Sequence, residues 1–332
     1  MRFAPVSPLT GWGLVVAASG LDWLVGDPLA WPHPVQVMGW GINRLRRGLE
    51  PWCRQQPRRL QLAGVVVAAT MLLLAVGAGM AVEWGARRWP PLGIPCLVLA
   101  VASCLAGRSL AQRVTAVLTR LEPVPDLPGA RQALARIVGR DVTHLGHRDI
   151  LRGAAESASE NAVDGAFAPL FWILVGVGLQ AGFGDTAPGP LAMGWGFKAV
   201  STMDSMVGYR QGTLRWLGTA AARLEDGMVW LPCRLAALSL GIMLGRPWWL
   251  LTMARREGAA DPSPNAGVSM AAYAHAVGVR LGGRNRYGRQ ERDKPLLGMG
   301  YPDPQPASVV AMVQLTRRGL LLWLALAGAL AC

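Results

Sequence analysis

The sequence predicts an all-α, polytopic membrane protein with about five transmembrane helices and a site formed by cytoplasmic polar loops and helices. Hydrophobic residues make up 52% of the 332 residues and charged residues only 16%, whereas soluble domains carry about 25% charged residues. The run 60–82 contains no charged residue. At about 1.5 Å per residue it is long enough to cross a hydrocarbon core of about 30 Å. We therefore expect residues 1–332 to form a single integral membrane domain.

The other spans follow from shorter apolar runs. We expect transmembrane helices at residues 10–26, 60–82, 92–107, 166–182 and 227–252. The run 191–206 contains Lys198 and Asp204, and ionisable residues at membrane depth need protein or water around them. This run is therefore expected to form a re-entrant or an interfacial helix. The C-terminal apolar segment 319–332 is short for a full span.

The charge distribution predicts which side of the membrane the loops face. The 33 basic residues exceed the 20 acidic ones, and the segment 44–59 holds six Arg against one Glu. The positive-inside rule places this segment in the cytoplasm, and we expect the polar segments 108–165 and 254–306 there too. Arg-rich cytoplasmic loops and sites for anionic substrates explain the net charge of +13, so nucleic acid is not expected as a partner.

The segment 140–169 is polar and lies between two hydrophobic regions. At helical spacing, one face collects four charged side chains: Arg152, Glu156, Glu160 and Asp164. Like charges at this spacing oppose one another unless something cationic lies between them, such as Mg²⁺, a substrate amine or an Arg. The alternative is a solvated helix face. Small neighbouring residues and the apolar run that follows favour a polar site at a membrane edge.

Three further polar clusters are candidate binding sites, and two of them also have a purely structural interpretation. Lys198 in its apolar run suits a phosphate or a carboxylate, or it extends to the membrane interface. The adjacent Glu225 and Asp226 suit a divalent ion, or they are a charge pair at a helix N-terminus. The sequences SPNAG (263–267) and GVRLGGRNRYG (278–288) are typical of a Gly- and Arg-rich cradle for anions.

Several common motifs are absent from the sequence. It has no G-x-x-x-x-G-K-[ST], no H-E-x-x-H and no G-x-S-x-G, which argues against P-loop, zincin and α/β-hydrolase chemistry. The five cysteines form no C-x-x-C, and their odd number argues against a disulfide framework. We expect them to be reduced.

Six segments, in this order, resemble the adenosylcobinamide-phosphate synthase family of cobalamin biosynthesis (CobD/CbiB): GDPLAWPHPVQVMG, RDVTHLGHRDILRGAAESASENAVDGAFAPLFW, FKAVSTMDSMVGYR, ARLEDGMVWLPCRL, SPNAG and VRLGGRNRYG. The resemblance covers roughly residues 20–320. Three positions depart from the family's usual pattern. Ser201 stands where Asn is usual, Glu225 where Asp is usual, and Val229 where Asn is frequent.

The resemblance implies a multi-pass protein of the bacterial inner (cell) membrane whose active face is cytoplasmic. It also implies an acid–amine ligase (EC 6.3.1.-), which joins (R)-1-amino-2-propanol, or its O-phosphate, to the free propionate of adenosylcobyric acid. The product is adenosylcobinamide or its phosphate. The sequence leaves open which amine is used, and whether the protein acts as a homodimer or in a complex with other late corrinoid-pathway enzymes.

Amide formation from a carboxylate and an amine in water is uphill, so we expect ATP and Mg²⁺ as cofactors. Such a site also needs cationic groups for phosphate and a base for the amine proton. The expected catalytic residues are Glu156, Glu160, Asp164, His144 and Lys198. The expected metal ligands are Glu156, Glu160, Asp164 and Asp226. Substrate or phosphate binding is expected at Asp27, His33, Asn161, Asp204, Tyr209, Arg210, Arg223, Asn265, Arg284 and Tyr287.

Other classes of protein fit the sequence less well. A membrane transporter should show paired halves, and none are visible. A CDP-alcohol phosphotransferase should carry D-x-x-D-G-x-x-A-R, which is missing. A corrin-binding scaffold subunit would not need several polar clusters separated by spans.

Overall fold

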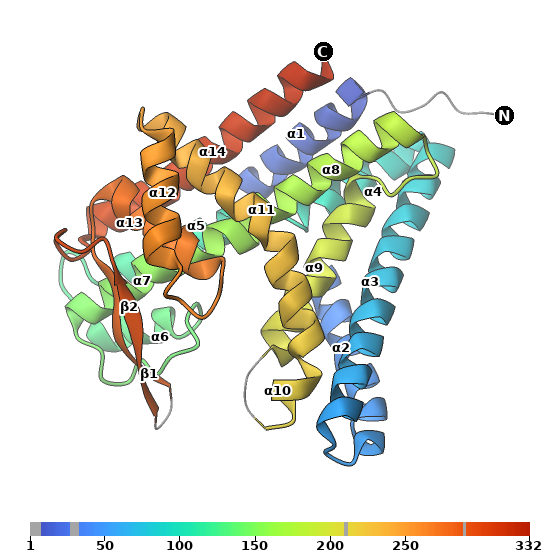
Figure 1. The fold of residues 1–332 in the computed structure, drawn as a ribbon. Coiled ribbons are helices and arrows are strands. Elements are labelled where there is room, and N and C mark those ends of the chain that lie inside the picture. Colours follow the sequence, from blue (N-terminus) through green and yellow to red (C-terminus); the bar gives the residue numbers. More distant parts are fainter. Residues whose placement is uncertain (1–7, 27–32, 209–211, 288–289) are drawn as a thin grey trace. The chain divides into compact units, whose positions relative to one another are not determined.

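The computed structural model describes residues 8–26, 33–208, 212–287 and 290–332, and it is mostly helical (Figure 1). The chain forms two compact units. The first unit comprises Met1–Ala106, Ala168–Met228 and Leu324–Cys332, and the second comprises Gly107–Phe167 and Val229–Trp323. The expectation of one membrane domain over the whole chain stays a prediction.

Among the described residues, four helical runs are long and apolar enough to cross a membrane: Pro57–Arg88, His147–Phe183, Thr219–Met243 and Pro306–Ala331. A fifth is counted if α4 (Pro90–Ala102) and α5 (Gly107–Leu118), which a short break separates, form one broken span. The prediction of a polytopic all-α protein is confirmed. Helix α1 (Pro8–Leu24), where the span 10–26 is predicted, has 17 residues, roughly 26 Å, and is not among these four runs.

Proline marks where many of the helices begin. Its fixed φ suits the first helical turn, where its missing N–H costs no hydrogen bond. Seven helices start at a proline: α1, α2 (Pro34–Leu49), α3 (Pro57–Arg88), α4, α9 (Pro190–Val207), α12 (Pro247–Gly258) and α14 (Pro306–Ala331).

The first unit is built around α3 (Pro57–Arg88), which runs beside α9 (Pro190–Val207) (Figure 1). Apolar side chains of both helices form its core, among them Val67, Met71, Val200 and Met203. Helices α1, α2 (Pro34–Leu49), α4, α8 (Ala168–Phe183) and the short α10 (Leu214–Leu217) belong to the same unit. Gly79 lets the two long helices approach, because a Cβ there would lie 2.5 Å from Cα of Ala192.

A buried carboxylate fixes the start of α9. The side chain of Glu83, on α3, accepts hydrogen bonds from the backbone N–H groups of Leu191 (2.7 Å), Gly189 (3.1 Å) and Ala192 (3.1 Å). The side-chain amide of Gln180 donates a further bond at 3.2 Å. These N–H groups have no partner within the helix, and the helix dipole favours an anion there. Glu83 is therefore a capping group supplied from another helix.

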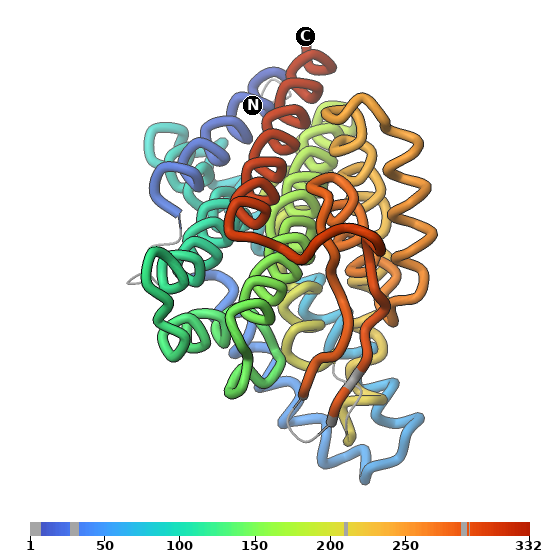
Figure 2. Tube along the Cα trace, turned by 90° about the vertical axis from the view of Figure 1, so that its left-hand side faces the viewer, coloured from blue at the N-terminus to red at the C-terminus, as the bar shows by residue number. Residues whose placement is uncertain are grey.

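The second unit combines helices with one hairpin. Its helices include α5, α6 (Leu127–Leu134), α7 (His147–Ala162), a π-helical turn (Val163–Phe167), α12 (Pro247–Gly258) and α13 (Ala266–Val277). Strands β1 (Leu281–Tyr287) and β2 (Gln290–Leu297) pair antiparallel, with an irregularity between Leu281 and Gly283. Strand β1 packs against α7 (Figure 2).

The structure changes the bounds of two predicted segments. The predicted span 227–252 overlaps α11 (Thr219–Met243), which is long and apolar enough to span. However, α11 ends at a turn in which Gly245 has a φ of 69°, and α12 begins at Pro247. The polar segment 254–306 contains α13 and the hairpin. The C-terminal segment 319–332 is part of the longer helix α14 (Pro306–Ala331), which is long enough to span.

Replacing Gly79 by Ala should lower the free energy of unfolding by about 1–3 kcal/mol, because the new methyl group would overlap the backbone of α9. The measurement is the midpoint of thermal unfolding in detergent. Gly77→Ala is the matched control, since a Cβ at Gly77 meets nothing within 4 Å. Equal midpoints for the two variants would contradict the close approach of α3 and α9.

Candidate functional site

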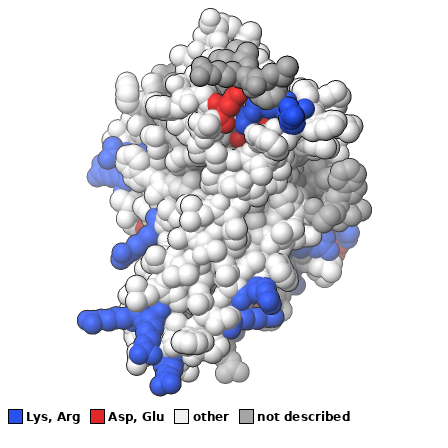
Figure 3. Space-filling model, turned by 90° about the vertical axis from the view of Figure 1, so that its right-hand side faces the viewer, with Lys and Arg blue, Asp and Glu red and all other residues white. Residues whose placement is uncertain are grey.

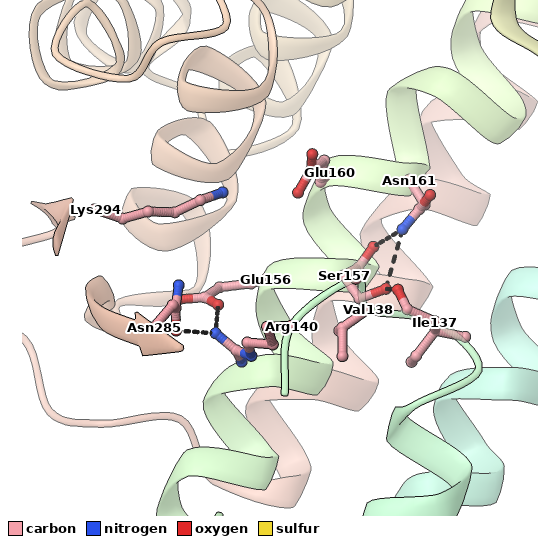
Figure 4. Close-up of a pocket in the computed structure, with 10 residues that line it drawn as sticks. Ile137, Val138, Arg140, Glu156, Ser157, Glu160, Asn161, Asn285 and Lys294 are labelled. Atoms are coloured by element: carbon pink, nitrogen blue, oxygen red, sulfur yellow. Dashed lines mark hydrogen bonds and ion pairs between the residues drawn. The ribbon is translucent and has the colours of Figure 1, made fainter. Parts of the chain in front are cut away.

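A polar pocket of about 230 Å³ lies in the second unit (Figure 4). It is formed by α7, by the loop that precedes α7 and by the hairpin. Its lining residues are Ile137, Val138, Gly139, Arg140, Glu156, Ser157, Glu160, Asn161, Asn285 and Lys294. The segment 140–169, which the sequence singles out, thus supplies one wall.

A buried ion pair holds the three elements of the pocket together. Nη1 of Arg140 donates to Oε2 of Glu156 at 2.6 Å and also to the side-chain oxygen of Asn285 on β1. The other carboxylate oxygen of Glu156 accepts the backbone N–H of Gly282 at 2.9 Å. The side chains of Arg140 and Glu156 are 4% and 8% exposed. In such surroundings an ion pair is costly to break, because one charge would be left without a partner.

Arg152 fastens the hairpin one helical turn earlier. Its guanidinium donates to the backbone carbonyl oxygens of Gly282 and Arg284, both at 3.0 Å, and it pairs with Asp149 at 3.2 Å. Gly282 and Gly283 have φ values of 84° and 91°, a conformation that favours glycine. The irregular start of β1 therefore lets its backbone reach both Arg152 and Glu156.

The loop before α7 is shaped by short hydrogen bonds. The Ser157 hydroxyl donates to the carbonyl of Ile137 at 2.9 Å, and the Asp141 N–H donates to the carbonyl of Arg286 at 2.8 Å. The Asp141 carboxylate accepts from the hydroxyl and the backbone N–H of Thr143, at 2.5 and 2.9 Å. These bonds lower the pKa of Asp141 from its usual value.

Glu160 and Lys294 carry the remaining charges that face the pocket. Figure 4 shows the Lys294 ammonium group and the Glu160 carboxylate pointing toward one another from opposite sides. Nζ of Lys294 also lies 4.0 Å from a carboxylate oxygen of Asp261. Asn161, beside Glu160, donates to the hydroxyl and carbonyl oxygens of Ser157 at 3.0 and 2.9 Å. The pocket thus offers one carboxylate and one ammonium group to a small polar ligand.

The π-helical turn changes the position of Asp164. An α-helix would place it one turn after Glu160 on the same face, but the structure has a π-helix over Val163–Phe167. Such a turn inserts an extra residue into the helical register, and π-bulges are frequent at functional sites. Asp164 is half-buried and does not line the pocket.

The structure brings together three of the predicted site residues in this pocket: Glu156, Glu160 and Asn161. Both carboxylate oxygens of Glu156 already have partners. His144 is exposed and is not among the lining residues. The catalytic and metal-binding roles of all these residues stay predictions.

Other predicted residues lie in the first unit. They are His33, Lys198, Asp204, Arg223 and Asp226. Nδ1 of His33 accepts the Val35 N–H at 3.3 Å and caps α2. Helix α9, which is not among the candidate spans, carries Lys198 and Asp204. Burial and the nearby Asp226 carboxylate raise the pKa of Asp204, as expected for two carboxylates that share a region.

Two predicted anion-binding residues have partners within the protein. Asn265 is buried, and its side-chain oxygen accepts from Nη1 of Arg234 at 2.5 Å, so the SPNAG motif anchors the start of α13 to α11. Arg284 is exposed and pairs with Asp293 (3.4 Å) and Glu291 (3.6 Å) on β2. Asp27, Tyr209, Arg210 and the side chain of Tyr287 lie outside the described residues.

No three His, Cys, Asp or Glu side chains in the described parts of the chain lie close enough together to hold a metal ion. Mg²⁺ commonly uses one or two carboxylates together with substrate phosphates and water. Glu160 in the second unit, or Asp204 with Asp226 in the first, fits that sparser kind of site.

Sequence reasoning missed Arg140, Asn285 and Lys294 as parts of the pocket. Lys294 is one of only two lysines in the chain, and this rarity could have identified it as a candidate functional residue. Asn285 lies within the segment 278–288 that the sequence predicts as an anion cradle, but its place in this pocket depends on the pairing of β1 with β2.

Comparisons with known proteins agree with the motifs. A family model described as "CobD/Cbib protein" matches residues 15–316. The "Cobalamin biosynthesis protein CobD" of Synechocystis sp. is 39% identical over 97% of this chain and 92% of its own length. The "Cobalamin biosynthesis protein CbiB" of Salmonella paratyphi B is 37% identical over 94% and 92%. The "Cobalamin biosynthesis protein CobD" of Geobacter metallireducens is 37% identical over 86% of this chain and 86% of its own length. No solved structure matches.

Replacing Glu156 by Gln should destabilise the protein by about 3–5 kcal/mol, because Arg140 would keep a buried charge without its counter-ion. The measurements are the thermal midpoint in detergent and amide exchange of residues 281–297, which should become faster. Arg120→Gln is the control, since it breaks the exposed ion pair of Arg120 with Asp126, and its midpoint should change little. A wild-type exchange rate in the Glu156 variant would contradict the anchoring role.

Proposed function

The chain belongs to the CobD/CbiB protein family, and from this premise we propose that it is an ATP-dependent acid–amine ligase. Its role is in cobalamin biosynthesis, as the names of its relatives indicate. The proposed reaction forms an amide between the free propionate of adenosylcobyric acid and (R)-1-amino-2-propanol or its O-phosphate. The proposed location is the bacterial inner membrane, with the active face in the cytoplasm.

The observation that carries the proposal is the position of Glu160. This residue lies in one of the segments that resemble the family, and its carboxylate faces the pocket opposite Lys294. The pocket of about 230 Å³ is smaller than the roughly 300–1,000 Å³ of most small-molecule sites. It suits the small amine substrate, while the corrin would bind outside it.

The residues of the pocket fit the proton transfers that amide formation needs. An amine enters as an ammonium ion, and it becomes a nucleophile only after it loses a proton. Glu160 is placed to hold the ammonium ion and to accept that proton. Lys294, on the other side of the pocket, stabilises negative charge on the group that approaches the amine. The hydrogen bonds between Asn161 and Ser157 fix the helix face next to Glu160.

The proposal also includes ATP and Mg²⁺. When bound, ATP supplies the free energy that activates the propionate. Asp204 with Asp226, in the first unit, would hold the metal ion together with the nucleotide phosphates, and Lys198 and Arg223 are the proposed phosphate contacts in the same unit.

The test is an end-point assay of purified protein in detergent with adenosylcobyric acid, Mg-ATP and either the amino alcohol or its phosphate. The mass of the corrin should increase by the mass of one amine less one water, and only when ATP is present. Folded protein that binds corrin but yields no mass gain with either amine would refute the ligase and favour a transport or scaffold role.

Glu160→Gln should lower kcat by about 10²–10⁴-fold, because the amide side chain cannot accept the amine proton. Asp164→Ala, which removes a carboxylate that the sequence predicts as a metal ligand, should likewise abolish product. Both variants should still insert into the membrane. The matched control is Glu122→Gln, which removes an exposed carboxylate outside the pocket. Wild-type turnover in both the Glu160 and Asp164 variants would exclude the assigned roles.

A further inference from the structure

The turn between α2 and α3, in the first unit, carries an unusual concentration of exposed positive charge. Among the described residues, five arginines in this turn and in the adjoining ends of α2 and α3 are exposed and form no ion pair: Arg44, Arg47, Arg54, Arg58 and Arg59. The sixth, Arg46, pairs with Glu50 at 3.5 Å. The turn lies at the bottom of Figure 1, and Figure 3 shows basic side chains gathered at that end of the molecule.

Large apolar side chains are exposed next to these arginines. Trp40 is 67% exposed, Trp52 82% and Leu62 66%. From Leu62 onward, the outer face of α3 is apolar, and Figure 3 shows a broad uncharged surface above the basic side chains. Tryptophan side chains are enriched where a membrane meets water. Basic side chains beside exposed tryptophans are the pattern expected at the level of the lipid headgroups.

The same turn contains a pocket of about 470 Å³, lined by Arg47, Glu50, Pro51, Arg54, Gln55, Leu60 and Thr213. The carboxylate of Glu50 is engaged by the Thr213 hydroxyl at 2.6 Å and by Arg46, which leaves Arg47 and Arg54 to set the charge of the pocket. Arg54 and Gln55 have φ values of 46° and 58°. This conformation is costly for residues other than glycine and is common at ligand sites.

We propose that this pocket binds the headgroup of an anionic phospholipid. Arg47 and Arg54 form hydrogen bonds with its phosphate, Trp40 and Trp52 lie at the interface, and the acyl chains follow the apolar face of α3 from Leu62. The phosphates of a nucleic acid would also pair with the arginines. Unlike a lipid, however, a nucleic acid has no acyl chains to contact the apolar surface that continues along α3. A free phosphate ion would need neither the tryptophans nor that surface.

The test uses the purified full-length chain in a non-ionic detergent, titrated with phosphatidylglycerol or phosphatidylcholine. Bound lipid is counted by native mass spectrometry. The wild-type protein should retain phosphatidylglycerol in preference to phosphatidylcholine. The double variant Arg47→Gln/Arg54→Gln should bind it about 30-fold more weakly, since each basic side chain at a membrane surface contributes about fivefold in affinity.

The matched control is Arg113→Gln/Arg136→Gln, which removes the same charge from two exposed arginines of the second unit and should leave lipid binding unchanged. Inorganic phosphate and a single-stranded RNA are added as competitors at constant ionic strength. Three outcomes would overturn the proposal: equal retention of both lipids, equal losses in the two double variants, or full displacement of the lipid by phosphate or RNA.

Discussion

The buried ion pair between Arg140 and Glu156 is the interaction on which the candidate site depends. It joins a loop, a helix and a hairpin that are distant in the sequence, and Asn285 and the Gly282 N–H complete its hydrogen bonds. A pair that is almost removed from water gains little net stability, since both charges lose their hydration. The ion pair instead fixes the position of the hairpin, because a displaced hairpin would leave a buried charge without a partner. Lys294, on β2, faces Glu160 only while that hairpin stays in place.

Side chains of α7 consequently have two different tasks. Arg152 and Glu156 hold the hairpin through its backbone, while Glu160 and Asn161, one turn later, face the pocket. The charged side chains that recur at helical spacing therefore have different roles: Arg152 and Glu156 hold the hairpin, and Glu160 has the proposed catalytic role. The π-helical turn that follows ends this row and allows the chain to continue into the apolar helix α8.

The sequence predicted the features that depend on local pattern. Apolar runs indicated most of the long helices, and the spacing of carboxylates indicated that Glu156 and Glu160 share a helix. Features that depend on distant pairing were not predictable. The hairpin is rich in glycine and arginine, which are poor signals for strands, and it is stabilised by contacts with α7. The break at Gly245 was missed although the sequence marks it, because Gly245, Arg246 and Pro247 form a helix-stop signal between two apolar runs. The π-helical turn has no sequence signature that could have corrected the position of Asp164.

Glu83 has a consequence for how the protein is made. Its partners, the N–H groups at the start of α9, come more than 100 residues later in the chain. When α3 first leaves the ribosome, its carboxylate has no N–H groups to bind, and an ionised side chain at the centre of a membrane helix costs about 2.5–3.5 kcal/mol on insertion scales. Helix α3 therefore does not have its stabilising hydrogen bonds to Glu83 until α9 has been synthesised. The early and late parts of the chain must be present together before this helix reaches its final depth, so an N-terminal fragment that ends before α9 would be a poor substitute for the complete protein.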